Sequence, residues 1–128
     1  MPVKILCDTN FLLIPIRFGV DIFQESEKTL NDVTTFYVSS RVLDEIRILK
    51  KKARPTIEKE LMFAEKIAER CIFVYDDSCS LVDDSLISLA NKMGMVLGTT
   101  DSILRKKARL EGIKELYLRQ RRYLILDG

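Results

Sequence analysis

The sequence contains no histidine, and this absence excludes several kinds of active site. Ser-His-Asp and Cys-His catalysis both need an imidazole, and so does acid–base cleavage of RNA by histidine. Any chemistry that the chain performs must therefore use carboxylates, hydroxyls, amines or a bound metal ion.

Cysteine is scarce, with Cys7, Cys71 and Cys79 spread along the chain and no C-x-x-C pair. Four zinc ligands cannot be assembled from isolated cysteines when no histidine is present to complete the set. We therefore expect neither disulfide bonds nor a structural zinc site.

Long hydrophobic runs are also absent. The longest, residues 11–16, falls far short of the ~20 apolar residues that a membrane span needs. The N-terminus has no basic segment followed by an apolar core and a small-residue cleavage site, as a secretory signal would. We expect a cytoplasmic protein with no membrane partner, and a chain of 128 residues is the length of a single domain, residues 1–128.

Apolar segments of two kinds alternate along the chain. Short β-branched runs predict strands near residues 3–7, 35–38, 72–75, 95–98 and 115–118, and a closing apolar segment covers 123–126. Between them, apolar residues recur at helical spacing, and Leu49 and Met62 fall on the faces expected to be buried. Alternation of this kind predicts an α/β fold, a three-layer α/β/α sandwich around a central parallel sheet of about five strands.

Four acidic residues occupy positions that are unusual for surface acids. Asp8 directly follows the first predicted strand, and Asp101 follows the fourth in the same manner. Glu45 borders the apolar stripe of its helix, and Asp83 lies at the first turn of another. Ligands gather outside the carboxyl ends of strands in open α/β sheets, so the topology could bring these four carboxylates together.

Each acid also has a purely structural interpretation. Asp8 and Asp101 could cap the helices that follow them. Ser80 and Asp83 match a capping box, and Glu45 could pair with Arg41 or Lys52.

If the four carboxylates converge, their repulsion must be compensated. Two like charges about 4 Å apart cost on the order of 4 kcal/mol at an effective dielectric near 20. A divalent cation would relieve this cost, and oxygen ligands without histidine favour Mg²⁺ or Mn²⁺. Such an ion supports phosphodiester hydrolysis by activating a water molecule and stabilising the developing charge.

Positive charge is concentrated in two segments, although the net charge is only +2. Residues 41–54 contain six Lys/Arg and two acids, and residues 101–128 contain eight and four. A polyanion partner suits basic segments beside an acidic centre, whereas the alternative is that they are ordinary solvated helix faces. The candidate RNA-binding residues are Lys50, Lys51, Lys52, Arg54, Arg105, Lys106, Arg119, Arg121 and Arg122.

Taken together, the acidic positions resemble those of the PIN domain family. The motifs are Asp8-Thr9-Asn10, Glu45, Val82-Asp83-Asp84 and Gly98-Thr99-Thr100-Asp101, and the similarity spans essentially the whole chain. The opening at residues 8–23 and the ending at 117–124 resemble the archaeal branch related to the rRNA-processing endonuclease of the small-subunit processome.

This resemblance implies a Mg²⁺/Mn²⁺-dependent ribonuclease that acts on an rRNA precursor. It assigns the catalytic and metal-binding roles to Asp8, Glu45, Asp83 and Asp101, with Asp84 as the secondary choice. Asn10 would orient the Asp8 carboxylate, and Thr9, Thr99 and Thr100 would support the site. As partners it admits RNA, a second copy of the chain in a homodimer, and ribosome-assembly factors.

Two alternatives remain at the level of sequence. One is a PIN ribonuclease of the toxin type, held in check by an antitoxin. The other is an RNA-binding or assembly module that keeps the acidic pocket without cleaving.

Overall fold

The structure is a computed structural model that describes residues 2–128. Its centre is a six-stranded sheet with the spatial order β3-β2-β1-β4-β5-β6. The strands are β1 (Val3–Cys7), β2 (Thr34–Ser39), β3 (Ile72–Val74), β4 (Val96–Gly98), β5 (Glu115–Arg119) and β6 (Tyr123–Asp127). Strands β1 to β5 pair in parallel, and β6 runs antiparallel to β5.

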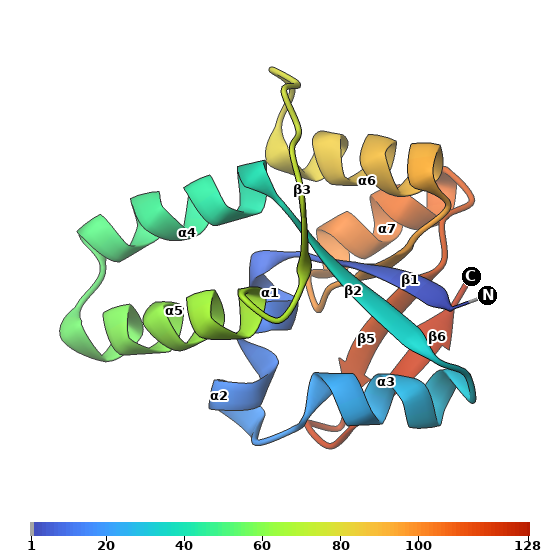
Figure 1. Cartoon of the computed structure of the whole chain (residues 1–128), viewed down its shortest axis with the longest axis horizontal. Coiled ribbons are helices and arrows are strands. Elements are labelled where there is room, and N and C mark those ends of the chain that lie inside the picture. The colour runs from blue at the N-terminus through green and yellow to red at the C-terminus, as the bar shows by residue number, and fades with distance from the viewer. Residues whose placement is uncertain (1) are drawn as a thin grey trace.

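Seven helices connect these strands. They are α1 (Thr9–Leu12), α2 (Ile14–Phe18), α3 (Ile22–Leu30), α4 (Ser40–Lys52), α5 (Pro55–Ala68), α6 (Val82–Met93) and α7 (Ser102–Leu110). Figure 1 shows α6 and α7 on one side of the sheet and α3 on the other, while α4 and α5 lie side by side and extend beyond its edge. The mixed α/β fold with a sheet between helical layers is confirmed.

Strand β1 lies in the middle of the sheet because its residues can be buried on both faces. Ile5, Leu6 and Cys7 are fully buried, as expected of a central parallel strand covered by helices on each side. β1 pairs with β2 on one side and with β4 on the other. The residue that follows β1 is therefore held at the centre of the carboxyl edge of the sheet.

The order of the strands also places the site. From β1 the chain moves outward through β2 and β3, then returns across the sheet to β4 on the other side of β1. Connections on the two sides of such a reversal diverge, and this leaves a crevice between the ends of the two strands. Asp8 follows β1 and Asp101 closely follows β4, so both lie at this crevice.

Three expectations from the sequence need correction. The closing apolar segment is a sixth strand, and it runs antiparallel because only the short connection 120–122 separates it from β5. Leu49 and Met62 are 43% and 48% exposed, although their spacing placed them on buried faces. Both lie on the α4–α5 pair, which reaches past the sheet and has less of the core to cover it.

No helix in the described part of the chain is both long and apolar enough to cross a membrane.

Candidate active site

Asp8 is a buried carboxylate at the junction of β1 and α1, only 6% exposed. Its Oδ1 accepts a hydrogen bond from the Phe11 backbone N–H at 2.7 Å, which caps α1. Its Oδ2 accepts a hydrogen bond from the Thr99 hydroxyl. The capping interpretation is thus correct for Asp8, and it leaves the carboxylate held firmly at the crevice.

Thr99 connects the two acids at the strand ends. Its hydroxyl donates to Asp8 and accepts from the backbone N–H of Asp101 at 3.0 Å. Asp101 in turn caps α7, because its Oδ1 accepts from the N–H groups of Ile103 and Leu104 at 2.8 and 3.3 Å. This arrangement uses one oxygen of Asp101 and leaves Oδ2 without a protein donor among the described residues.

Glu45 reaches the same place from helix α4. The Thr9 hydroxyl donates to Glu45 Oε1 at 2.5 Å, so α4 is tied to the residue next to Asp8. Arg41 donates instead to the carbonyl oxygens of Ser78 and Ser80. Within residues 2–128 Glu45 forms no ion pair with Arg41 or Lys52, so the alternative structural role for Glu45 is wrong.

Asp83 and Asp84 differ although they are adjacent on α6. The helix begins after Leu81 without a side-chain cap, so the capping-box interpretation of Asp83 is wrong. Asp84 lies 3.8 Å from the Lys107 ammonium and is about half exposed. Asp83 is partly buried, and burial and the nearby charge of Asp101 raise its pKa, so Asp83 is the better candidate of the two for the acidic site.

Burial dominates the electrostatics of Asp8. Its pKa is raised from 3.8 to about 7: burial is the largest cause, the charges of Glu45 and Asp101 add to the rise, and the hydrogen bonds from Thr99 and Phe11 oppose it. A buried carboxylate shifted in this way at a crevice marks a candidate functional site. The charges of Glu45 and Asp101 both act on Asp8, and that of Asp101 also acts on Asp83.

The donor chemistry of this cluster fits a hydrated hard cation. Within residues 2–128, no three acidic or cysteine side chains are arranged to hold a metal ion among themselves. Mg²⁺ does not need such a cage, since it is usually bound by one or two carboxylates together with waters and substrate phosphates. Oxygen atoms are available for this role, and a cation would stabilise the charged form of Asp8, which burial and the neighbouring acids disfavour.

The supporting residues only partly follow the expectation. Among the described residues Asn10 makes no side-chain hydrogen bond to Asp8, so the role assigned to it belongs to Thr99 and the Phe11 N–H. Sequence reasoning missed the link from Thr9 to Glu45, which joins residues 36 positions apart. A threonine immediately after a strand-end acid was the available signal, but nothing in the sequence named its partner.

The basic residues divide into paired and unpaired groups. Lys50 pairs with Glu65 at 2.7 Å, and the Arg105 guanidinium lies 3.6 Å from Glu115 and 3.4 Å from the centre of the Tyr117 ring. The remaining candidates form no ion pair within residues 2–128 and are Lys51, Lys52, Arg54, Lys106, Arg119, Arg121 and Arg122.

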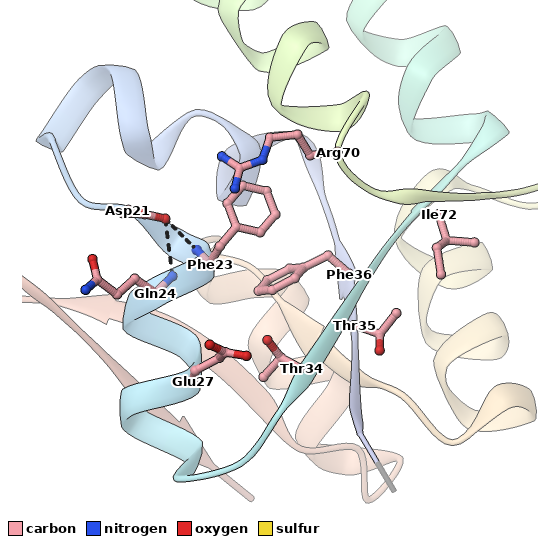
Figure 2. A pocket seen from close by; sticks show the side chains of 9 residues that line it. All are labelled: Asp21, Phe23, Gln24, Glu27, Thr34, Thr35, Phe36, Arg70 and Ile72. Atoms are coloured by element: carbon pink, nitrogen blue, oxygen red, sulfur yellow. Dashed lines mark hydrogen bonds between the residues drawn. The ribbon is translucent and has the colours of Figure 1, made fainter.

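A separate pocket lies between α3 and the beginning of β2 (Figure 2). The Arg70 guanidinium lies 3.8 Å from the centre of the Phe23 ring, which packs edge-on against Phe36. None of the four candidate acids lines this pocket, so it is distinct from the crevice.

The arrangement of acids at the crevice agrees with a match over most of the chain. A family model described as a PIN-like domain matches residues 5–121. The chain belongs to this family. PIN domains are generally nucleases, and the resemblance inferred from the acidic motifs is confirmed at the level of the family.

Individual relatives are distant in sequence. "Ribonuclease VapC4" of Methanocaldococcus jannaschii is 24% identical over 127 residues, which cover 98% of this chain and 97% of the relative. The structure is similar to that of the PIN domain endonuclease Utp24, with a TM-score of 0.81 and 20% identity over 98% of this chain and 92% of the other. It is also similar to VapBC2 from Rickettsia felis bound to a promoter DNA fragment, with a TM-score of 0.58 and 16% identity over 81% and 92%. At these identities the likeness to solved structures establishes the PIN fold.

Proposed function

We propose that this chain is a divalent-metal-dependent endoribonuclease that hydrolyses phosphodiester bonds in an rRNA precursor during ribosome maturation in the cytoplasm. The observation that carries the proposal is the set of acids contributed by four elements, with Asp8 buried and its pKa raised by this burial and, to a smaller extent, by the charges of Glu45 and Asp101. Membership of the PIN-like family supports nuclease chemistry. The likeness of the opening and closing segments to the rRNA-processing branch supports the choice of RNA.

In this proposal Asp8 and Asp101 are the principal carboxylates for Mg²⁺ or Mn²⁺, and Glu45 and Asp83 complete the acidic rim. The bound ion supplies a more acidic water molecule and neutralises charge on the phosphate. Thr99 fixes the Asp8 carboxylate by donating to it. Thr9 fixes Glu45 in the same way, so neither acid must be ordered when RNA arrives.

The cleavage test compares the wild type with Asp8→Asn on precursor rRNA in the presence of Mn²⁺. We expect Asp8→Asn to lower the cleavage rate on the order of a hundredfold or more, because it removes the charge at the centre of the site. Cleavage products resolved on a denaturing gel are the measurement. Equal cleavage by both proteins, or cleavage by neither, would contradict the hydrolase.

Asp83 and Asp84 offer a matched pair for the same assay. Asp83→Asn removes a carboxylate near Asp101 and is expected to lower the rate strongly. Asp84→Asn changes the neighbouring residue in the same chemical way but only disturbs an exposed pair with Lys107, so it is expected to retain most activity. The reverse order would assign the role to Asp84.

A toxin-type ribonuclease is the second candidate, because the curated relative is named as a VapC ribonuclease. It predicts growth arrest on expression and a small antitoxin encoded in the neighbouring gene. A chain expressed without harm, and with no such neighbour, favours RNA maturation. The third candidate, a non-cleaving assembly module, predicts RNA binding in the cleavage assay without products.

A further inference from the structure

An open pocket adjoins the acidic crevice between α1, α2, α4 and α5. It encloses about 340 Å³, and its lining includes Thr9 and Asn10 at one end and Lys52 at the other. None of the four candidate acids lines it, but Thr9 of its lining donates to Glu45, so the pocket and the candidate active site share this contact. Its size lies at the lower end of the range for small-molecule sites.

A ridge on α4 connects the acids with the basic end of that helix. Glu45, Leu49 and Lys52 are spaced by four and three residues, and this spacing places them on one face. At 1.5 Å per residue, Leu49 lies about 6 Å along the helix from Glu45, and Lys52 lies about 10 Å from it. Along this face of the helix, a carboxylate is therefore followed by an apolar side chain and then by an ammonium group.

The middle of this ridge is unusual because it is apolar and accessible. Leu49 lines the pocket and is 43% exposed, together with the partly buried Ala53 and Ile57. Asn10 also lines the pocket, and its side chain makes no hydrogen bond within residues 2–128. An apolar wall beside a free amide suits a flat group with polar edges.

The charges around the pocket select the ligand. Lys52 has no ion-pair partner in the described part of the chain, and the exposed Lys51 and Arg54 lie before and after it in the sequence. Arg17, the other basic residue in the lining, is paired with Glu60 at 3.1 Å. Net positive charge therefore lies at the end of the pocket away from the acids, where it would meet the phosphate that follows a bound base.

We propose that this pocket holds one unpaired nucleobase of the RNA, adjacent to the phosphate at the acidic crevice. Leu49 contacts the face of the base, the Asn10 amide hydrogen-bonds its edge, and Lys52 meets the next phosphate. Unpaired bases are recognised in this way, by contact with their faces and hydrogen bonds to their edges. The inference rests on the proposed function, because it takes RNA as the substrate.

The test measures RNA affinity in the full chain carrying Asp8→Asn, which separates binding from cleavage. The probes are a fluorescent single-stranded oligoribonucleotide and versions with one abasic site at successive positions. Leu49→Ala is compared with Ile48→Ala, since Ile48 is the neighbouring residue, is 55% exposed and does not line the pocket. Thermal melting of each variant reports whether the fold is retained.

We expect Leu49→Ala to weaken binding of the intact oligonucleotide about fivefold, from the loss of apolar contact, and Ile48→Ala to leave it unchanged. An abasic site at one position should weaken binding to the Asp8→Asn protein similarly and cause no further loss when Leu49→Ala is added. If Leu49→Ala and Ile48→Ala bind the oligonucleotide with equal affinity, the proposed base pocket is wrong. An abasic penalty that is as large with Leu49→Ala as without it would also overturn it and leave the pocket to a protein ligand.

The outcome is distinguishable from failure of the nuclease itself. Leu49-dependent binding without cleavage by the wild type would retain the base pocket and reject the hydrolase. Cleavage by the wild type with no dependence on Leu49 would retain the hydrolase and reject the pocket.

Discussion

Asp8 combines two roles that the sequence presented as alternatives. It caps α1 through one oxygen and is held by Thr99 through the other, while burial and the neighbouring acids raise its pKa to about 7. The hydrogen bonds fix the carboxylate in position, and the pKa records how costly its charge is without a cation. Capping is therefore compatible with the proposed role as metal ligand.

The raised pKa predicts a pH-dependent stability. Between the ordinary value of 3.8 and about 7, the folded protein binds a proton at Asp8 that the unfolded chain has already released. Stability should therefore fall as the pH rises through this window, by up to roughly 4 kcal/mol. Urea unfolding of the metal-free protein across this range measures the effect.

Asp8→Asn should remove this component, whereas Asp84→Asn should retain it. At pH 8, Mn²⁺ should stabilise the wild type and leave Asp8→Asn unaffected, because the ion replaces the lost proton. Parallel stability curves for the wild type and Asp8→Asn would show that Asp8 titrates normally.

At the scale of elements, a close contact between β4 and α1 brings the acids together. A Cβ added to Gly98 would lie 3.0 Å from the Phe11 ring, so only glycine allows the ring to pack directly on this strand. The Asp8 N–H also donates to the Gly98 carbonyl at 3.1 Å. This contact aligns the ends of β1 and β4, where Asp8 and Thr99 meet.

Gly98→Ala should therefore destabilise the protein by about 1–3 kcal/mol through overpacking against a fully buried ring. Phe11→Leu creates space, so the double variant should lose less stability than the sum of the two single variants. Chemical denaturation of the four proteins measures this coupling. Additive losses would mean that the ring does not limit the residue at position 98.

The β5–β6 connection contains a second local constraint. Gln120 and Arg121 have φ values of +53° and +59°, a left-handed conformation that costs roughly 1–2 kcal/mol for residues other than glycine. Glycine removes this cost but loses more conformational entropy on folding, so Arg121→Gly should stabilise the protein by about 0.5–1 kcal/mol in thermal unfolding. Arg122→Gly is the control, because it removes the same charge from a residue outside the left-handed region, and it should destabilise the protein. An equal effect of the two substitutions on thermal unfolding would contradict the role of the backbone conformation.

At the scale of the whole molecule, charge is arranged around the sheet edge that holds the acids. β5 is parallel to β4, so Arg119 and the turn after it lie at the same carboxyl edge as Asp8 and Asp101. Positive side chains at this edge would hold the backbone of RNA on either side of the crevice.

Changing Arg119, Arg121 and Arg122 together to Gln should weaken RNA binding and reduce its salt dependence. The slope of log affinity against log salt should fall by about 0.7 for each lost phosphate contact. In the control protein, three lysines are changed to Gln in the same way. They are Lys28, Lys92 and Lys114, which are exposed residues at the opposite, amino edge of the strands. Fluorescence anisotropy across a salt series measures the RNA affinity of each variant. Equal slopes for the two triple variants would mean that the arginines are ordinary surface residues.

The sequence alone determined the alternating elements and the parallel sheet, and it predicted the four acids of the candidate site, because periodicity and strand-end positions are local properties. It could not determine that Leu49 is exposed or that the last segment runs antiparallel, since both depend on what packs nearby. It also allowed a capping box for Asp83 and an ion pair for Glu45, and neither is present among the described residues. Only the tertiary structure joined Thr9 to Glu45 and Thr99 to Asp8, residues 36 and 91 positions apart, because the reversal of strand order at β1 brings distant strand ends to one crevice.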